Sequence, residues 1–468
     1  MQNDESIWPC HSAPMNLKLT TLLLLCCFNI NAAVIAILDN GVDHSHYKLK
    51  NNIYKNYVEV QNNRDDDRNG YVDDVMGWNF IAMNNVVFDF EREIYLTHDI
   101  ERYYHLRAKD SLGTITEVED REYSILKKDK ELKERRSEFT SWMHGTHIAG
   151  IAANTSELPE ELEEDDILLL PIVYLGDATS GPALAPEFKP TASRNLRTQR
   201  RHLNSYWKEF MAWQVNKFKL GARYAASKAQ VANGSFGQSF GGIQDRMKSY
   251  YKEQIGQELS EEDSFKAAQD FMVELMVQTE KVLKKFPNTL FVFSAGNKKN
   301  DSDIYIHFPS AARLPNVLSV GASFEYNEMA YFSNFGKETV DLFAPGLAIH
   351  STIPRQGHLR INGTSQASPF VANTAAKAIA LAKKLNIKIS IKDIRKIILL
   401  TVNKKDELRE KSVAGGIIHP ARVYKTIRLL RRYSLSRSIN YANSWIPDMA
   451  ITHEKSDHKG LFIELPTP

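Results

Sequence analysis

The stretch Gly363-Thr364-Ser365-Gln366-Ala367-Ser368-Pro369 lies where the sequence pattern changes from strand to helix. Residues 359–362 are a short run typical of a strand, and residues 367–385 are apolar and alanine-rich, as in a tightly packed helix. Ser365 is therefore expected at or near a helix start. The first N–H groups there have no partner within the helix, and the helix dipole adds positive charge. A backbone N–H could hold a developing oxyanion at that point, although an ordinary N-cap has the same local pattern.

Length and composition allow one large α/β domain with insertions or two domains, because the chain has 468 residues. A formal charge of +2 gives no reason to expect a nucleic-acid partner. Met15 to Lys18, the apolar run 19–30 and the small residues at 32–33 predict a secretory signal peptide cleaved after Ala32. The alternative is a buried N-terminal strand or helix. The apolar run is short for a bilayer, so we expect secretion without a stable membrane anchor.

The positions of the cysteines agree with a cleaved signal peptide. Cys10, Cys26 and Cys27 all precede the predicted cleavage point, so the mature chain would contain no disulfide.

A second candidate site residue follows the predicted cleavage point. The run 33–38 is continuously apolar, as in a parallel strand buried on both faces, and Asp39 comes directly after it. Open α/β sheets place their chemistry at the carboxyl ends of such strands. A turn-forming Asp before Gly41 is the alternative on local grounds.

The acidic segment 65–74 has the spacing of a calcium loop. Oxygen ligands fall at positions 1, 3, 5 and 9, a glycine at position 6 and a carbonyl at position 7. The candidate ligands are Asp65, Asp67, Asn69, Tyr71 and Asp73. Position 12 is Met76 instead of glutamate, so a solvated acidic turn remains the alternative. We expect no cofactor for catalysis, and structural calcium is possible.

The rest of the chain alternates strands with helices, which predicts a mostly parallel sheet. Strands are expected at 167–175, 230–235, 289–294, 317–322 and 340–343, and helices at 207–229 and 264–286. Charge-rich residues at about 89–140 and the stretch at about 177–206 are predicted insertions. The expected organisation is 1–32 as upstream residues and signal peptide, 33–431 as one catalytic domain, and 432–468 as a tail of unknown role.

Two more segments complete a possible catalytic constellation. His144 begins the small-residue helical stretch 144–153, in which His147 is expected to be structural. Asn297 follows a buried strand and could donate its amide to an oxyanion, or it could cap a turn. Acyl transfer by serine needs a base, a carboxylate that orients the base, and oxyanion donors. Ser365, His144, Asp39 and Asn297 would supply these roles.

The order Asp, His, Ser in these contexts resembles the subtilisin-like serine proteases (the subtilase or peptidase S8 family), which also serve as a general example of the catalytic triad. The similar motifs are 37–43, 144–150, 295–297 and 363–369, with a further similar stretch at 308–311, and the resemblance runs from about Val34 to Leu430. It implies a three-layer α/β fold with a mostly parallel seven-stranded sheet, and a secreted, monomeric endopeptidase acting on protein or peptide substrates.

The resemblance also implies a substrate cleft. Ser235, Phe236 and Gly237 would pair with an extended substrate, and Ala295 and Gly296 would complete the wall of its specificity pocket. Phe236 suggests that apolar side chains are accepted.

The sequence departs from the family pattern at several positions. Gln366 stands where the family usually has Met, and Phe370 where it usually has His. No space for an N-terminal propeptide follows the predicted cleavage point. The calcium loop or the 91–139 segment is therefore expected to take over its role in folding.

Two other functions remain open. Gly237-Gln238-Ser239-Phe240-Gly241 matches the G-x-S-x-G elbow of an esterase, with Ser239 as nucleophile. A catalytically silent, calcium-binding relative of the proteases is the non-enzyme alternative.

Overall fold

A central, mostly parallel sheet organises the structure, a computed structural model that describes residues 32–176, 181 and 183–449. Residues 1–31 of the predicted signal peptide, which include its cysteines, and the segment 450–468 therefore lie outside the described residues. The strand order is β11-β12-β8-β6-β5-β4-β1-β3-β2, with β7 paired to β6. Among the described strands of this sheet, the β11–β12 and β6–β7 pairs are antiparallel and the other pairs are parallel.

The strands of this sheet are β1 (Ala33–Asp39), β2 (Trp78–Asn79), β3 (Ile167–Val173), β4 (Val231–Gly234), β5 (Leu290–Ser294), β6 (Val317–Phe324), β7 (Glu328–Met329), β8 (Leu342–Pro345), β11 (Asn403–Lys404) and β12 (Gly416–Ile417). The sheet thus has ten strands among the described residues instead of the seven expected. Six of the ten have four or more residues, and the other four, β2, β7, β11 and β12, have two residues each, which is too short to give a periodic sequence signal. A separate hairpin pairs β9 (Ile349–Ile353) with β10 (Gly357–Ile361).

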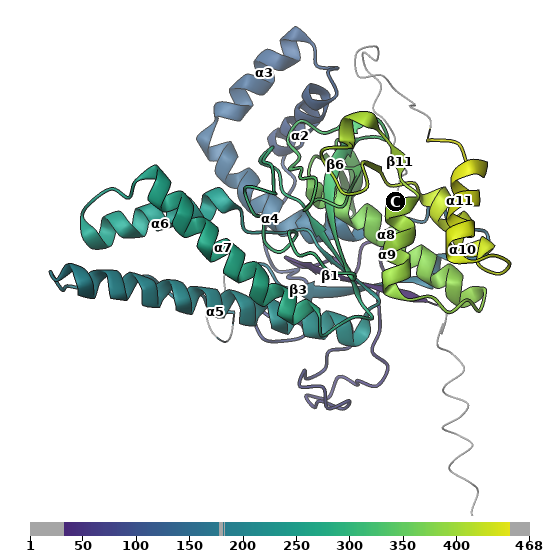
Figure 1. The fold of residues 1–468 in the computed structure, drawn as a ribbon, viewed down its shortest axis with the longest axis horizontal. Coiled ribbons are helices and arrows are strands. Elements are labelled where there is room, and N and C mark those ends of the chain that lie inside the picture. The colour runs from purple at the N-terminus through teal and green to yellow at the C-terminus, as the bar shows by residue number, and fades with distance from the viewer. Residues whose placement is uncertain (1–31, 177–180, 182, 450–468) are drawn as a thin grey trace, which may run out of the picture.

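Helices cover both faces of the sheet, which gives the three expected layers (Figure 1). They are α2 (His98–Ser111), α3 (Glu117–Lys128), α4 (Lys130–Ala152), α5 (Leu196–Lys228), α6 (Phe240–Ile255), α7 (Glu261–Leu283), α8 (Thr364–Lys384), α9 (Ile391–Leu400), α10 (Pro420–Leu429) and α11 (Leu435–Trp445). No helix in the described ranges is long and apolar enough to cross a membrane.

The side chains of β1 alternate between the two faces of the sheet, which explains why helices cover both faces. Ala33, Ile35 and Ile37 pack into the core shared with α4, α8, α9 and α10. Val34, Ala36 and Leu38 pack into the core shared with α5, α6 and α7. Successive side chains of a strand point to opposite faces, so a strand that is apolar throughout requires a helical layer on each side.

The charged insertion has a small core of its own. Tyr103, Tyr123 and Phe139 pack with Ile353 and Leu359 of the β9–β10 hairpin. Helix α4 begins inside the insertion at Lys130 and continues without a break into the stretch that carries His144. The insertion is therefore joined to the candidate site by one helix.

The segment after residue 431 is also structured in part. Helix α11 packs on α10, and Arg422 donates to the carbonyl oxygen of Ile446 and to Asp448. The chain up to Met449 thus belongs to the same folded body as the sheet.

Candidate active site

Asp39 and His144 form a hydrogen-bonded pair at the carboxyl edge of the sheet. Asp39 ends β1, and its side chain is fully buried. The Nδ1 atom of His144 lies 2.8 Å from Oδ1 and 3.0 Å from Oδ2 of Asp39. A carboxylate can only accept, so Nδ1 carries the proton and Nε2 is left as the basic nitrogen of the neutral ring. The His144 side chain is 17% exposed, which leaves it accessible from solvent.

Gly145 allows this close approach of α4 to β1. A Cβ atom at position 145 would lie 2.1 Å from the carbonyl oxygen of Gly41 and 3.1 Å from Cβ of Asp39. Since the contact with the backbone of Gly41 is far too short to be tolerated, only glycine permits the spacing at which His144 reaches the carboxylate.

The pKa of His144 reflects two opposing effects. Burial lowers the pKa, while the charge of Asp39 and its hydrogen bond raise it, and the net result is a raised pKa. Asp39 thus favours the imidazolium form that a general base must adopt after taking a proton.

Ser365 lies in the first turn of α8, as the sequence predicted. Its hydroxyl donates to the carbonyl oxygen of Ser235 at 3.2 Å, and the hydroxyl of Ser235 donates to the carbonyl oxygen of Ser365 at 2.8 Å. The nucleophile candidate is therefore joined directly to the expected substrate strand.

His147 and Gln366 connect the helix of His144 to that of Ser365. His147 is buried one turn beyond His144, and its Nε2 lies 3.0 Å from the carbonyl oxygen of Leu359. The carbonyl can only accept, so Nδ1 is free to accept from Nε2 of Gln366 at 3.4 Å. Burial lowers the pKa of His147 to about 3, so the ring is neutral. Gln366, which stands where the family usually has Met, thus has a structural role that the sequence did not reveal.

Asn297 lies beside the start of α8. Its Oδ1 accepts from the backbone N–H and the hydroxyl of Thr364, both at 2.9 Å. These bonds assign the oxygen of the amide and leave Nδ2 as the outward donor. Nδ2 lies 3.6 Å from the position that a Cβ on Gly363 would occupy, so the amide lies close to Gly363, two residues before Ser365.

The expected substrate-wall residues converge on a histidine that sequence reasoning missed. A Cβ on Gly237 would lie 2.0 Å from the His307 ring, and one on Gly296 would lie 3.0 Å from it. Phe236 packs against Tyr174 with ring centroids 4.8 Å apart, and Ala295 is buried beside Gly296. Burial lowers the pKa of His307 to about 4, so the wall carries a neutral imidazole. The only available sequence signal was its position directly before the family-like stretch 308–311.

The acidic loop groups its carboxylates differently from the prediction. Asp65 accepts from the N–H groups of Asn69 and Gly70, and Asp73 accepts from those of Asn62 and Asn63. The carboxylates that come within 4.8 Å of one another belong to Glu59, Asp67 and Asp74, so only Asp67 is shared with the predicted set. Asn69 donates to this cluster through its side chain, and the Tyr71 ring packs on Trp78.

A lysine already lies within that cluster, which could otherwise hold a metal ion. Nζ of Lys228 is 3.2 Å from Asp74 and 3.6 Å from Asp67, and its side chain is only 9% exposed. Tyr224 donates to Asp74, and Asn56 donates to both Asp67 and Asp74. These donors occupy the oxygens that a cation would use, so the arrangement fits calcium poorly as it stands.

Ser239, the alternative nucleophile, caps α6 by accepting from the N–H of Gly242. In an esterase elbow the nucleophile directly follows a strand. Strand β4 ends at Gly234, so Ser239 does not meet this requirement.

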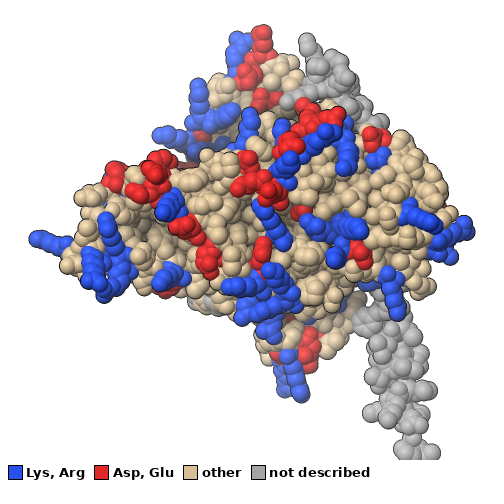
Figure 2. All heavy atoms as spheres, viewed as in Figure 1, with Lys and Arg blue, Asp and Glu red and all other residues tan. Residues whose placement is uncertain are grey.

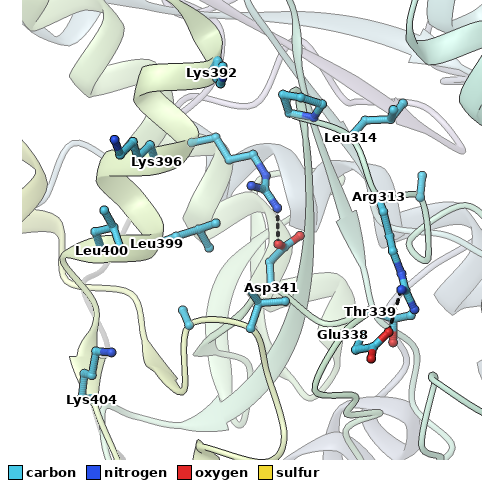
Figure 3. A pocket seen from close by; sticks show the side chains of 15 residues that line it. Arg313, Leu314, Glu338, Thr339, Asp341, Lys392, Lys396, Leu399, Leu400 and Lys404 are labelled. Atoms are coloured by element: carbon cyan, nitrogen blue, oxygen red, sulfur yellow. Dashed lines mark hydrogen bonds and ion pairs between the residues drawn. The ribbon is translucent and has the colours of Figure 1, made fainter.

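A large cavity of about 660 Å³ lies at the opposite, amino edge of β6 and β8 (Figure 3). Ion pairs Arg395–Asp341 and Arg313–Glu338 form part of its lining. It is separate from the Asp39–His144 pair, which lies at the carboxyl edge.

Known proteins resemble this chain over the same region. The profile of the subtilase family, Peptidase_S8, matches residues 31–416. Subtilisin-like protease 2 of Plasmodium falciparum is 27% identical over 150 residues, which are 32% of this chain and 11% of that protein. Subtilisin-like serine protease Pen ch 18 of Penicillium rubens is 41% identical over 106 residues, or 22% of this chain and 20% of that protein. The matched stretches thus span a fifth or less of these relatives.

Among solved structures, a lanthipeptide protease aligns with 84% of this chain and 87% of its own, at 17% identity and a TM-score of 0.46. The family match covers most of the chain, and the sheet and its helical layers have the expected arrangement. The chain belongs to the subtilase family of serine peptidases.

Proposed function

We propose that this protein is a serine endopeptidase in which Ser365 attacks the peptide carbonyl and forms an acyl-enzyme. The observation that carries the proposal is the buried Asp39–His144 hydrogen bond on a helix that is joined, through His147 and Gln366, to the helix start that carries Ser365. With Nδ1 engaged by Asp39, Nε2 of His144 takes the hydroxyl proton and later returns it to the leaving amine. The N–H of Ser365 and Nδ2 of Asn297 stabilise the oxyanion.

Substrate binding would also release the nucleophile. The carbonyl oxygen of Ser235 now accepts from the Ser365 hydroxyl, and an extended substrate pairing with Ser235 to Gly237 would bring its own N–H to that acceptor. The hydroxyl would then turn to His144. Ala295 and Gly296 would wall the specificity pocket, with His307 between them and Gly237.

Casein hydrolysis by wild type and Ser365→Ala tests the activity. We expect a loss of about 10⁴-fold or more in rate with unchanged circular dichroism, because the remaining donors cannot replace the nucleophile. Fluorophosphonate should label Ser365 in the wild type. Labelling at Ser239 would support the esterase, and no labelling at either serine would support the silent relative.

We also propose that the protein is exported, on the signal-like pattern of residues 15–33. Amino-terminal sequencing of secreted material should begin at Ala33, and recovery of residues 1–32 on the folded protein would contradict the proposal.

A further inference from the structure

Helices α5, α6 and α7 form an arm that extends beyond the sheet (Figure 1). The first part of α5 carries Arg197, Arg200, Arg201 and Lys208, whose spacing places them along one side of the helix. They line one recess together with Asn204. Lys and Arg side chains gather at this free end of the arm in Figure 2.

These four cations have no ion pair within the described part of the chain, unlike the lysines of the neighbouring helix. On α6, Lys248 pairs with Glu261 and Lys252 pairs with Glu258. The cationic side of α5 is therefore available for an external anion.

An apolar recess of about 510 Å³ adjoins this cationic side, and Arg200 and Asn204 border both. Its apolar lining comes from all three helices, through Leu203, Trp207, Met247, Tyr251, Ala267 and Phe271, and from Leu259 between α6 and α7. Asp263 is the acidic group at this recess, and its carboxylate accepts from Ser260 at the start of α7. The recess could receive one aromatic or branched aliphatic side chain.

Helix α6 connects this surface to the proposed substrate strand. It begins at Phe240, three residues after Gly237, and Tyr251 lies three turns further along. At about 1.5 Å per residue, the recess lies about 16 Å from the helix start. An extended peptide covers that distance with about five residues.

We propose that this arm is an exosite for the protein substrate, which binds an acidic segment containing an apolar anchor residue near the cleaved bond. The inference rests on the proposed peptidase function and names its substrate class. Carboxylates would meet the four cations, and the anchor would fill the recess. A peptide is favoured over an anionic membrane because the apolar side chains line a recess instead of protruding.

Two fluorogenic peptides test this proposal. Both contain the same cleavable core, which is first selected by screening a peptide library for cleavage by the wild-type protein. In the first peptide, the core is extended by an acidic flanking segment that contains Leu and Phe. In the second, Lys replaces each Asp and Glu of that segment. Each flanking segment is tested at the amino end and at the carboxyl end of the core. We expect about tenfold higher kcat/KM for the acidic flank, through a lower KM. Arg197→Glu/Arg201→Glu/Lys208→Glu should reverse the preference, and Ala267→Trp should remove the benefit by filling the recess.

Lys219→Glu, an exposed charge reversal on the same helix, is the matched control and should leave the preference unchanged. All variants should cleave the bare core peptide equally. Equal kcat/KM for both flanks would overturn the exosite.

Binding to Ser365→Ala separates the exosite from the peptidase proposal. The fluorescence anisotropy of the labelled acidic flank alone should increase when it binds to this variant. The increase should be absent when the triple charge reversal is added to Ser365→Ala. Both results are expected even if no peptide is cleaved. Binding to phosphatidylserine vesicles with no binding of the acidic flank would overturn the proposal in favour of a membrane surface.

Discussion

At the scale of single residues, Asp39 controls the protonation of His144. Because burial alone lowers the pKa of His144 and Asp39 raises it, Asp39→Asn should move the pKa downward. An NMR titration of the His144 ring should show this shift, and Asp43→Asn should not produce it. An unchanged pKa in Asp39→Asn would contradict the assigned role of the carboxylate.

The raised pKa of His144 also makes the stability of the protein depend on pH. A folded pKa above the unfolded value of about 6.5 means that the pair contributes its full stability below that value and loses it as pH rises through the folded pKa. The difference in unfolding free energy between wild type and Asp39→Asn should therefore shrink toward alkaline pH. Urea titrations at several pH values measure it.

Gly145 should tolerate no side chain. Gly145→Ala would place a methyl group against the backbone of Gly41, so α4 must move away from β1. We expect a loss of about 1–3 kcal/mol in unfolding free energy and a fall in kcat. Gly241→Ala, where nothing lies within 4 Å of the added Cβ, is the control, and an equal effect of both variants would contradict the packing argument.

At the scale of elements, the end of α5 supplies the positive charge of the acidic loop. Lys228→Met would leave buried carboxylates unpaired and should cost about 3–5 kcal/mol. Millimolar calcium should raise the Tm of this variant more than that of the wild type, because the ion can take the lysine's place. Lys219→Met is the control. A larger calcium effect on the wild type would show that a metal site operates beside Lys228.

At the scale of the whole molecule, the insertion covers part of the fold. Replacing residues 97–128 by a short Gly-Ser linker would expose Ile353, Leu359 and Ile361 of the β9–β10 hairpin. We expect a lower soluble yield and a lower Tm. Removing only 117–128, whose one buried residue is Tyr123, should have a smaller effect. Unchanged yield in the larger deletion would contradict a role in folding.

Much of the fold was predictable because its signals are local. The all-apolar run before Asp39 required a strand buried on both faces, and the alanine-rich run after Ser365 required a buried helix. The predicted catalytic side chains follow directly from the ends of these elements. Two-residue strands and the start of α4 inside the insertion left no comparable pattern.

The residues that end the buried strands and begin the helices can be read from the sequence alone, because alternation and helical periodicity are properties of neighbouring residues. Three contacts depend on the folded chain: Lys228 lies among Glu59, Asp67 and Asp74, Gln366 bonds to His147, and His307 lies between Gly237 and Gly296. Those contacts join residues far apart in the chain. Their partners are selected by packing of whole helices and strands, which no local pattern records.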